Sequence, residues 1–240
     1  YESLVKAQAY GEHRLPLYQF MILASKQHGK KHTVLEDYTR KTLNYGGLIL
    51  KSQVLGRLLH QKTESESNIG VMLPNTLAGA VALFALYAYR KVPTMINYTA
   101  GSKNVANNCI TSQLKTVITS RQFISKADLN EELQAIKNQV DQVIFLEDIA
   151  KGITLKDKLI GAYRALRLSH FYRKNPELVA PLDSPAVILF TSGSEGAPKG
   201  VVLSHRNVVA NIQQTSAVMD LMPTDSMFNC LPMFHAFGYN

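Results

Sequence analysis

The sequence predicts an α/β fold in which layered sheets are flanked by helices. Short apolar runs alternate with segments of helical periodicity along most of the 240 residues, and this alternation is typical of a parallel sheet with crossover helices. Apolar residues make up 46% of the chain and charged residues 18%, which are proportions of an ordinary globular protein. A chain of this length buries roughly three quarters of the surface that its unfolded form exposes, so we expect a sizeable core.

The first predicted elements are a helix, a short strand and a second helix. Pro16–His28 has a proline in its first turn, apolar side chains at helical spacing, and Gly29 just past its end. Thr33–Leu35 follows as a strand. Asn44 then caps a helix whose leucines fall near helical periodicity through His60.

Further strands are predicted from short apolar runs, with helical patterns in most of the intervals. These strands are Ile69–Leu73, Pro93–Ile96, Lys115–Thr119, Val143–Leu146 and Ala186–Phe190. The last of them reads AVILF, an unbroken apolar run that suits a strand buried on both faces. Ligands bind outside the carboxyl ends of parallel strands, so the segment after Phe190 is predicted to lie where a ligand binds.

Residues 69–89 carry no charged side chain, which raises the question of a membrane span. Pro74 and Asn75 interrupt the run early. The remainder is a helix of about 14 residues with Asn75 or Thr76 as its cap, too short to cross a bilayer. We therefore predict a buried strand and helix here.

The clearest shift in composition is the basic stretch Lys151–Lys174. Its seven Lys or Arg residues against the single Asp157 give a net charge of +6, most of the +8 of the whole chain. Its apolar residues at helical spacing are Leu155, Leu159, Ala162, Tyr163 and Leu166. The pattern predicts a basic amphipathic helix. Two interpretations stay open: a surface helix with its charged face in water, or a docking surface for an acidic carrier protein or an anionic membrane face.

The net charge of +8 favours acidic partners of several kinds, among them phosphate ligands, acidic proteins, anionic lipid and nucleic acid. The two cysteines, Cys109 and Cys230, match no metal or redox spacing. They are predicted to be buried, reduced thiols of a cytoplasmic protein.

The segment Phe190–His205 reads FTSGSEGAPKGVVLSH and is predicted to be a phosphate-binding loop. Glycines let backbone N–H groups approach phosphate oxygens, hydroxyls add hydrogen bonds, and a lysine neutralises charge. The residues that supply these groups are Thr191, Ser192, Gly193, Ser194, Gly196, Lys199 and Gly200. Glu195 is expected to point away from the phosphates. A flexible turn without a ligand is the alternative.

The loop fits neither of two common phosphate motifs. In the pattern G-x-x-x-x-G-K-[ST], Pro198 stands where the second glycine belongs; in G-x-G-x-x-G, Glu195 does so. The run TSGSEGAPKG followed by VVLSHRN instead resembles the phosphate loop of the acyl-adenylate-forming enzymes. That family includes AMP-forming acyl-CoA synthetases, luciferases and peptide-synthetase adenylation domains. A second motif of the family, LPMFHAFG, occupies Leu231–Gly238.

Four further stretches point to one branch of this family. They are YESL at Tyr1–Leu4, GVMLPN at Gly70–Asn75, MINYTAG at Met95–Gly101 and TSRQF at Thr119–Phe123. These stretches are similar to the synthetase part of the bacterial bifunctional acyl-[acyl carrier protein] synthetase and 2-acylglycerophosphoethanolamine acyltransferases. The resemblance implies that residues 1–240 are an incomplete N-terminal portion of the AMP-binding domain, within the large domain of the acyl-CoA synthetase-like fold. An acyltransferase domain is expected upstream and a C-terminal domain downstream. The initial Tyr1 in place of methionine agrees with a fragment.

The resemblance also implies roles for individual residues. The implied ATP-binding segment consists of Thr191, Ser192, Gly193, Ser194, Glu195, Gly196, Lys199 and Gly200. The Thr191 hydroxyl is expected to reach Mg²⁺, and Lys199 and His235 are the expected catalytic residues. His235 would orient the fatty carboxylate, and Phe237 and Gly238 would begin the acyl pocket.

The activity that the resemblance implies is activation of a long-chain fatty acid with ATP to acyl-AMP, then transfer to the phosphopantetheine thiol of acyl carrier protein. A lysophospholipid would be the substrate of the missing acyltransferase domain, and no nucleic-acid partner is expected. The full protein is expected at the cytoplasmic face of the bacterial inner membrane, with this fragment soluble, cytoplasmic and inactive alone. The alternatives are a long-chain acyl-CoA synthetase and a non-catalytic module that docks to a carrier or membrane.

Two further histidines are predicted not to be catalytic. His205 precedes a helix from Arg206 with Ser204 as its cap, and is expected to be structural. The stretch His32–Asp37 matches the H-x-x-x-x-D pattern of glycerolipid acyltransferases, but its middle residues are predicted to be a strand leading into a turn, so we expect no acyltransferase site there.

Overall fold

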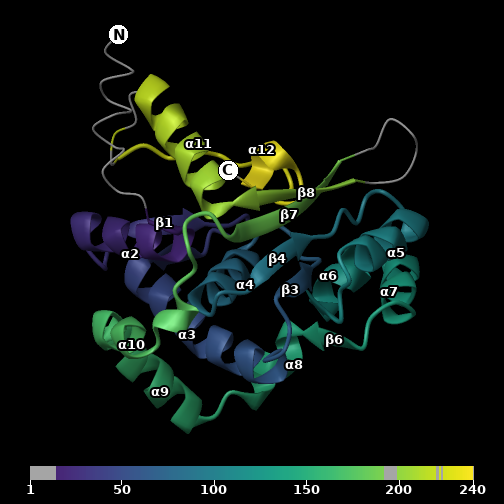
Figure 1. The fold of residues 1–240 in the computed structure, drawn as a ribbon, viewed down its shortest axis with the longest axis horizontal. Coiled ribbons are helices and arrows are strands. Elements are labelled where there is room, and N and C mark those ends of the chain that lie inside the picture. The colour runs from purple at the N-terminus through teal and green to yellow at the C-terminus, as the bar shows by residue number, and fades with distance from the viewer. Residues whose placement is uncertain (1–14, 192–198, 220–221, 223, 240) are drawn as a thin grey trace.

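The computed structural model describes residues 15–191, 199–219, 222 and 224–239. Figure 1 shows a central sheet with helices on both sides. The sheet has six strands in the order β6-β5-β3-β4-β7-β8, and β1 and β2 form a separate two-stranded sheet. The predicted α/β fold with helices flanking the sheet is confirmed.

The strands are β1 (Thr33–Glu36), β2 (Thr42–Asn44), β3 (Asn68–Val71), β4 (Val92–Met95), β5 (Thr116–Thr119), β6 (Gln142–Phe145), β7 (Pro185–Thr191) and β8 (Lys199–Ser204). The first helices are α2 (Leu17–His28), α3 (Tyr45–Lys62), α4 (Leu77–Ala88), α5 (Ser102–Thr111), α6 (Arg121–Lys126) and α7 (Asn130–Lys137). The later ones are α8 (Leu146–Gly152), α9 (Leu155–Leu166), α10 (Leu168–Lys174), the 3-10 turn η1 (Pro176–Leu178), α11 (His205–Val218) and α12 (Ala236–Tyr239).

Each strand predicted from the sequence occurs within two residues of its predicted bounds. Strands β3 to β7 pair in parallel, as expected. One glycine is required where β3 meets β5, because a Cβ on Gly70 would lie 2.6 Å from Cγ2 of Val117. The local signals for buried strands therefore sufficed to predict the centre of the sheet.

The predicted loop Phe190–His205 and the purely parallel sheet are both corrected at β8. Residues 199–204 form a strand that pairs antiparallel with β7, with Thr191 opposite Lys199. The run Val201, Val202, Leu203 has the β-branched and apolar side chains that favour a strand. The middle of the predicted loop, residues 192–198, lies outside the described residues.

The core has two parts, one on each face of the sheet. The larger joins α2, α3, α4 and α11 to the sheet, and the smaller joins α5, α6 and α7 to it. Neighbouring residues of one strand divide between them, since Val117 of β5 belongs to the smaller part and Ile118 to the larger. Such alternation is what a strand buried on both faces requires.

The uncharged run of residues 69–89 forms β3 and α4, as predicted. The α4 cap is Thr76, whose Oγ1 accepts a hydrogen bond from the backbone N of Gly79 at 3.2 Å, so Asn75 is free for the different role described below. In the part of the chain that the structure describes, no helix has the length and apolar character to cross a membrane.

The single basic helix predicted over Lys151–Lys174 is wrong in two respects. The stretch holds the end of α8 and all of α9 and α10, because Ile153 is extended and Arg167 has ψ of 35°, outside the helical region. In addition, most of the apolar side of α9 faces solvent instead of the core.

The predicted helix cap at Asn44 is present, whereas the prediction of two buried cysteines is right for only one of them. The Asn44 cap is confirmed, with its Oδ1 accepting from Gly47 N at 2.8 Å. Cys109 is buried, which raises the pKa of its thiol to about 12. Cys230 is exposed, so the prediction of two buried thiols is wrong for it; the residues around it, 224–230, are all exposed.

Candidate functional site

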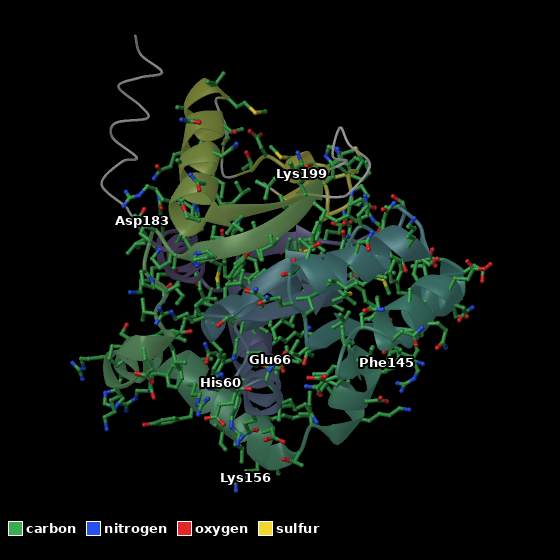
Figure 2. The ribbon with its side chains drawn as sticks, turned by 45° about the vertical axis from the view of Figure 1, so that its right-hand side comes forward. His60, Glu66, Phe145, Lys156, Asp183 and Lys199 are labelled. Carbon is green, nitrogen blue, oxygen red and sulfur yellow. The ribbon has the colours of Figure 1, made fainter. Side chains whose placement is uncertain are left out.

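The β7–β8 hairpin carries the described residues of the predicted phosphate loop. Thr191 ends β7 and Lys199 begins β8, and the two are directly paired across the antiparallel strands. Directly opposite side chains in such a pair lie on the same face with Cβ atoms about 4.5–5.5 Å apart. Both residues are exposed, and Figure 2 shows Lys199 at the end of its strand. A hydroxyl and an ammonium group are thus presented together, as an anionic ligand requires.

The other predicted residues of this loop divide into two groups. Gly200 is exposed and pairs with Phe190. Those that fall outside the described residues are Ser192, Gly193, Ser194, Glu195 and Gly196. Their assignment to the phosphates stays a prediction.

The second motif, residues 231–238, is a turn followed by the short helix α12. His235 N donates to the Pro232 carbonyl at 2.9 Å, and Gly238 N donates to the His235 carbonyl at 2.9 Å. Gly238 is buried, and a Cβ there would lie 2.2 Å from the Pro232 oxygen. Its place therefore requires glycine for close backbone packing. His235 is exposed, and the side chain of Phe237 lies outside the described residues.

Asn75 anchors this motif to the sheet. Its Nδ2 donates to the Leu231 carbonyl at 2.6 Å, and its Oδ1 accepts from Met233 N at 3.0 Å. Asn75 follows the carboxyl end of β3, so the amide joins the sheet edge to a segment more than 150 residues later. Asn75 ends the GVMLPN stretch and was predicted as a possible helix cap, but no site role was predicted for it. Its place directly after a buried strand was the signal that could have suggested a site role.

Tyr98 provides a second anchor from the neighbouring strand. It follows the carboxyl end of β4, and its ring packs edge-on against Phe234 at 4.8 Å and Phe123 at 4.9 Å between centroids. Burial raises the pKa of the Tyr98 phenol. This residue lies in the MINYTAG stretch, but no site role was predicted for it.

The two motifs meet at one edge of the sheet. Strands β3, β4 and β7 are neighbours and parallel, so Asn75, Tyr98 and Thr191 all follow or end strands on the same side. Figure 1 shows α12 beside β8. The carboxyl edge of the sheet therefore gathers the exposed Thr191, Lys199 and His235, as expected for a ligand site of an α/β sheet.

The described residues present a hydroxyl and a cation at this edge of the sheet. In the described part of the chain, no group of three or more His, Cys, Asp or Glu residues is placed to hold a metal ion. Magnesium is usually bound through few protein oxygens together with phosphate oxygens and water. One hydroxyl, that of Thr191, beside the cation of Lys199 is compatible with a magnesium–phosphate ligand.

His205 has the structural role predicted for it, and the strand and turn predicted within and after His32–Asp37 are present. His205 is buried, its Nδ1 accepts a hydrogen bond from Leu17 N at 3.3 Å, and burial lowers its pKa to about 4. The His32 ring stacks on Tyr45 with centroids 6.1 Å apart. Asp37 instead accepts from Thr39 and from the backbone of α4, with its pKa lowered chiefly by the Thr39 hydroxyl.

Comparison with known proteins gives a family match over most of the chain. A family model described as AMP-binding enzyme matches residues 23–240. Among curated relatives, 4-coumarate–CoA ligase 1 of Petroselinum crispum is 25% identical over 231 residues, which cover 94% of this chain and 40% of that protein. A long-chain-fatty-acid–CoA ligase of Salmonella typhimurium is 29% identical over 193 residues, covering 71% of this chain and 34% of that protein. The chain thus spans well under half the length of these relatives.

Solved structures match in fold. VinN superposes with a TM-score of 0.72 at 19% identity over 93% of this chain and 52% of that one. An o-succinylbenzoate CoA synthetase from Bacillus subtilis, solved with its acyl-adenylate intermediate, gives a TM-score of 0.71 at 16% identity over 93% of this chain and 51% of that chain.

Proposed function

This chain belongs to the AMP-binding enzyme family, and from that membership we propose that it is part of a ligase that activates a long-chain fatty acid with ATP. The observation that carries the proposal is the pairing of Thr191 with Lys199 at the sheet edge to which Asn75 anchors the second motif. The similarity to a long-chain-fatty-acid–CoA ligase supports the choice of substrate.

In the proposed reaction, ATP supplies the electrophilic α-phosphorus and pyrophosphate as leaving group. An oxygen of the fatty carboxylate forms a bond to that phosphorus as the bond to pyrophosphate breaks, giving acyl-AMP. Lys199 would neutralise charge on the β- and γ-phosphates, and the Thr191 hydroxyl would donate a hydrogen bond there or, with Mg²⁺ bound, offer its oxygen to the ion. Such a site accelerates the reaction by positioning the reactants and stabilising charge.

The second motif is proposed to hold the acyl substrate. His235 is exposed at the sheet edge and would orient the carboxylate for attack. Phe237 and Gly238 would begin the acyl pocket. The close packing of Gly238 against the Pro232 carbonyl supports a fixed backbone course at this point, which a positioning role requires.

The acceptor we propose is the phosphopantetheine thiol of acyl carrier protein. The support is the likeness of several stretches to the branch of bifunctional synthetase–acyltransferases, in which a lysophospholipid is reacylated at the cytoplasmic face of the inner membrane. Residues 1–240 would then be the N-terminal portion of the AMP-binding domain. The similarity to CoA ligases favours a second candidate, an acyl-CoA synthetase, in which coenzyme A is the acceptor.

The test is ATP–pyrophosphate exchange by the full-length protein across a series of fatty acids. Wild type is expected to exchange with long-chain acids, and Lys199→Ala to lower the rate about 100-fold or more. Lys137→Ala, at an exposed site on α7, is the matched control and should keep the wild-type rate. Wild-type rates in Lys199→Ala would contradict the proposal.

The acceptor is then identified by discharging the adenylate with acyl carrier protein or with coenzyme A in parallel. Faster discharge by the carrier supports the bifunctional branch, and faster discharge by coenzyme A supports the second candidate. The isolated chain is expected not to turn over, because it spans only part of its relatives' length.

A further inference from the structure

Helix α9 presents a stripe of large apolar side chains to solvent. The stripe residues, with their exposed fractions, are Leu155 at 73%, Leu159 at 63%, Tyr163 at 60% and Leu166 at 76%. Their spacing places them on one side of the helix. Over its 12 residues α9 is about 18 Å long, and the stripe runs along its whole length.

The opposite side of α9, which packs on α3, is small and polar. Gly161 lies so close to Val54 that a Cβ would meet its Cγ2 at 2.3 Å. Asp157 forms an ion pair with Arg57 at 2.5 Å, and the two side chains are only 13% and 18% exposed. This is the reverse of an ordinary surface helix, which buries its apolar side.

Arg164 fixes the rotation of the helix further. Its guanidinium donates to the Tyr89 hydroxyl and lies 4.7 Å from the centre of the Phe171 ring. Turning the leucines inward would break these contacts and the part-buried ion pair between Asp157 and Arg57. The outward stripe is therefore built into the packing.

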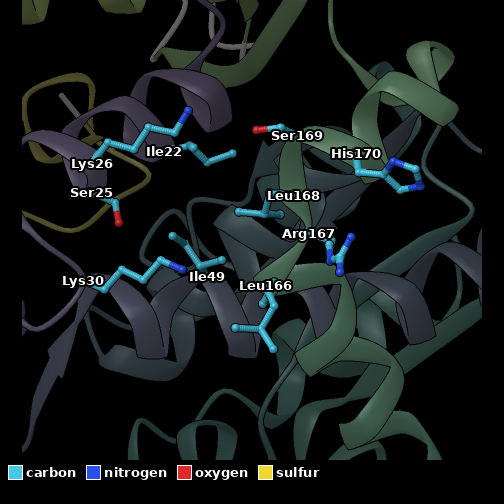
Figure 3. Close-up of a pocket in the computed structure, with 11 residues that line it drawn as sticks. Ile22, Ser25, Lys26, Lys30, Ile49, Leu166, Arg167, Leu168, Ser169 and His170 are labelled. Atoms are coloured by element: carbon cyan, nitrogen blue, oxygen red, sulfur yellow. The ribbon is translucent and has the colours of Figure 1, made fainter.

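Cations flank the stripe. Lys156 and Lys158 are exposed, and their positions on the helix place them on either side of the leucines. Beyond Leu166 a groove of about 300 Å³ has a mainly apolar lining that includes Ile22, Ile49 and Leu168, and the exposed Lys26, Lys30 and Arg167 also line it. Figure 3 shows the lysines reaching it from α2 and the following turn, and Arg167 from the α9–α10 junction.

We propose that α9 and this groove form a docking face for an anionic phospholipid bilayer. The stripe and the apolar lining of the groove contact the acyl chains, and Lys156, Lys158 and the cations that line the groove contact headgroup phosphates. An apolar stripe bordered by lysines is the arrangement of helices that lie in a membrane interface. A single exposed apolar stripe on one helix also suits a deformable bilayer better than a protein, whose interface requires matched shape.

The docking face leaves the candidate site accessible. In Figure 1, α9 lies at the bottom and the β7–β8 hairpin at the top of the same view. The proposal uses none of the residues assigned to ATP or the acyl chain, so it stands or fails independently of the proposed function.

Vesicle flotation tests the face. The chain is expected to float with vesicles that contain phosphatidylglycerol and to stay in solution with phosphatidylcholine alone. Lys156→Gln with Lys158→Gln should lower the partition constant about fivefold per lysine, and Leu159→Gln with Leu166→Gln about tenfold or more. The matched control for the lysine variant is Lys126→Gln with Lys137→Gln, at two exposed sites. The matched control for the leucine variant is Ile110→Gln on α5, where the isoleucine is 57% exposed. Both controls should bind as wild type does. Circular dichroism checks that each variant stays folded.

A fluorescent probe gives an independent readout, because the chain contains no tryptophan. Tyr163→Trp should show a blue-shifted emission on addition of the anionic vesicles. Tyr38→Trp, at a site that is 71% exposed in the turn between β1 and β2, should not shift. Equal shifts at both sites would overturn the proposal.

Three other outcomes would also overturn it. Wild type could fail to bind the anionic vesicles, or the stripe and lysine variants could bind them as well as wild type does. Alternatively, the same variants could lose binding to acyl carrier protein, or self-association in sedimentation, with vesicle binding unchanged. That last result would assign the face to an acidic protein or to a second copy.

Discussion

Asn75 holds the backbone of Leu231 through its side-chain amide, at 2.6 Å from Nδ2 to the carbonyl oxygen. This contact, with the return bond from Met233 N, joins the end of a central strand to the motif that contains His235. The exposed histidine is thus held next to the sheet, although it lies in the turn just before the short helix α12, near the end of the described chain.

Removing this amide should impair activity more than stability. Asn75→Ala loses two hydrogen bonds, each worth about 1 kcal/mol, and frees the second motif to shift. We expect a loss of about 1–2 kcal/mol in the free energy of unfolding and roughly tenfold slower ATP–pyrophosphate exchange by the full-length protein. Asn175→Ala removes one comparable bond, to the Phe171 carbonyl at 2.7 Å, at the end of α10. If both variants slowed exchange equally, the anchoring role would be wrong.

The aromatic contact of Tyr98 makes a second prediction. Tyr98→Ala removes edge-on contacts to Phe123 and Phe234, each worth about 0.5–1.5 kcal/mol beyond area burial. Urea denaturation should report a loss of about 2–3 kcal/mol, with slower exchange. Tyr98→Phe keeps both ring contacts and should stay within about 0.5 kcal/mol of wild type. A large loss in the Phe variant would mean that the hydroxyl carries the effect.

The packing of α9 on α3 predicts an unusual response to added helix propensity. Gly161→Ala should destabilise the chain by about 1–3 kcal/mol because the new methyl group meets Val54, although alanine favours helices. Gly152→Ala, in the last turn of α8, has nothing within 4 Å of its new Cβ and should be neutral or slightly stabilising. Urea melts that move both variants in the same direction would contradict this packing.

Stability should depend on pH through His205. Its pKa in the folded chain is about 4, below the unfolded value of about 6.5, so the unfolded state binds a proton first as the pH falls. The stability is therefore fully present above about pH 6.5 and falls by roughly 3 kcal/mol on the way to pH 4.

The conservative variant isolates that contribution. His205→Asn keeps an acceptor for Leu17 N but does not titrate, so its free energy of unfolding should change less steeply over the same window. Burial also lowers the pKa of His60, which adds a slope of the same sign to both proteins. Parallel curves for wild type and variant would contradict the role of His205.

The centre of the fold could be predicted from sequence because its signals are local. The apolar run AVILF of β7 and the uncharged run after Asn68 each predict a buried segment from composition alone. The cap at Ser204 is equally local, and Asn207 N donates to its hydroxyl at 3.2 Å. Helix and strand signals of this kind depend on neighbours a few residues apart.

What could not be predicted depends on distant partners. β8 becomes a strand through pairing with β7, and no pattern within Lys199–Ser204 reveals that partner. The outward rotation of α9 follows from a steric fit at Gly161, whereas periodicity identifies the apolar side of a helix but not the direction in which it faces. Asn75 finds its partners beyond residue 230, a distance that local patterns do not cover.

Strand β8 affects how the isolated chain is expected to aggregate in solution. It is one of the two edge strands of the six-stranded sheet, the other being β6, and Val201 and Val202 are 40% and 55% exposed. Because successive side chains point to opposite faces, neither face of β8 is fully covered. In the described part of the chain no other strand pairs with its outer edge. Such an edge recruits strands from other molecules. The strand that begins with Lys199 is therefore where aggregation should start as the concentration of the isolated chain is raised.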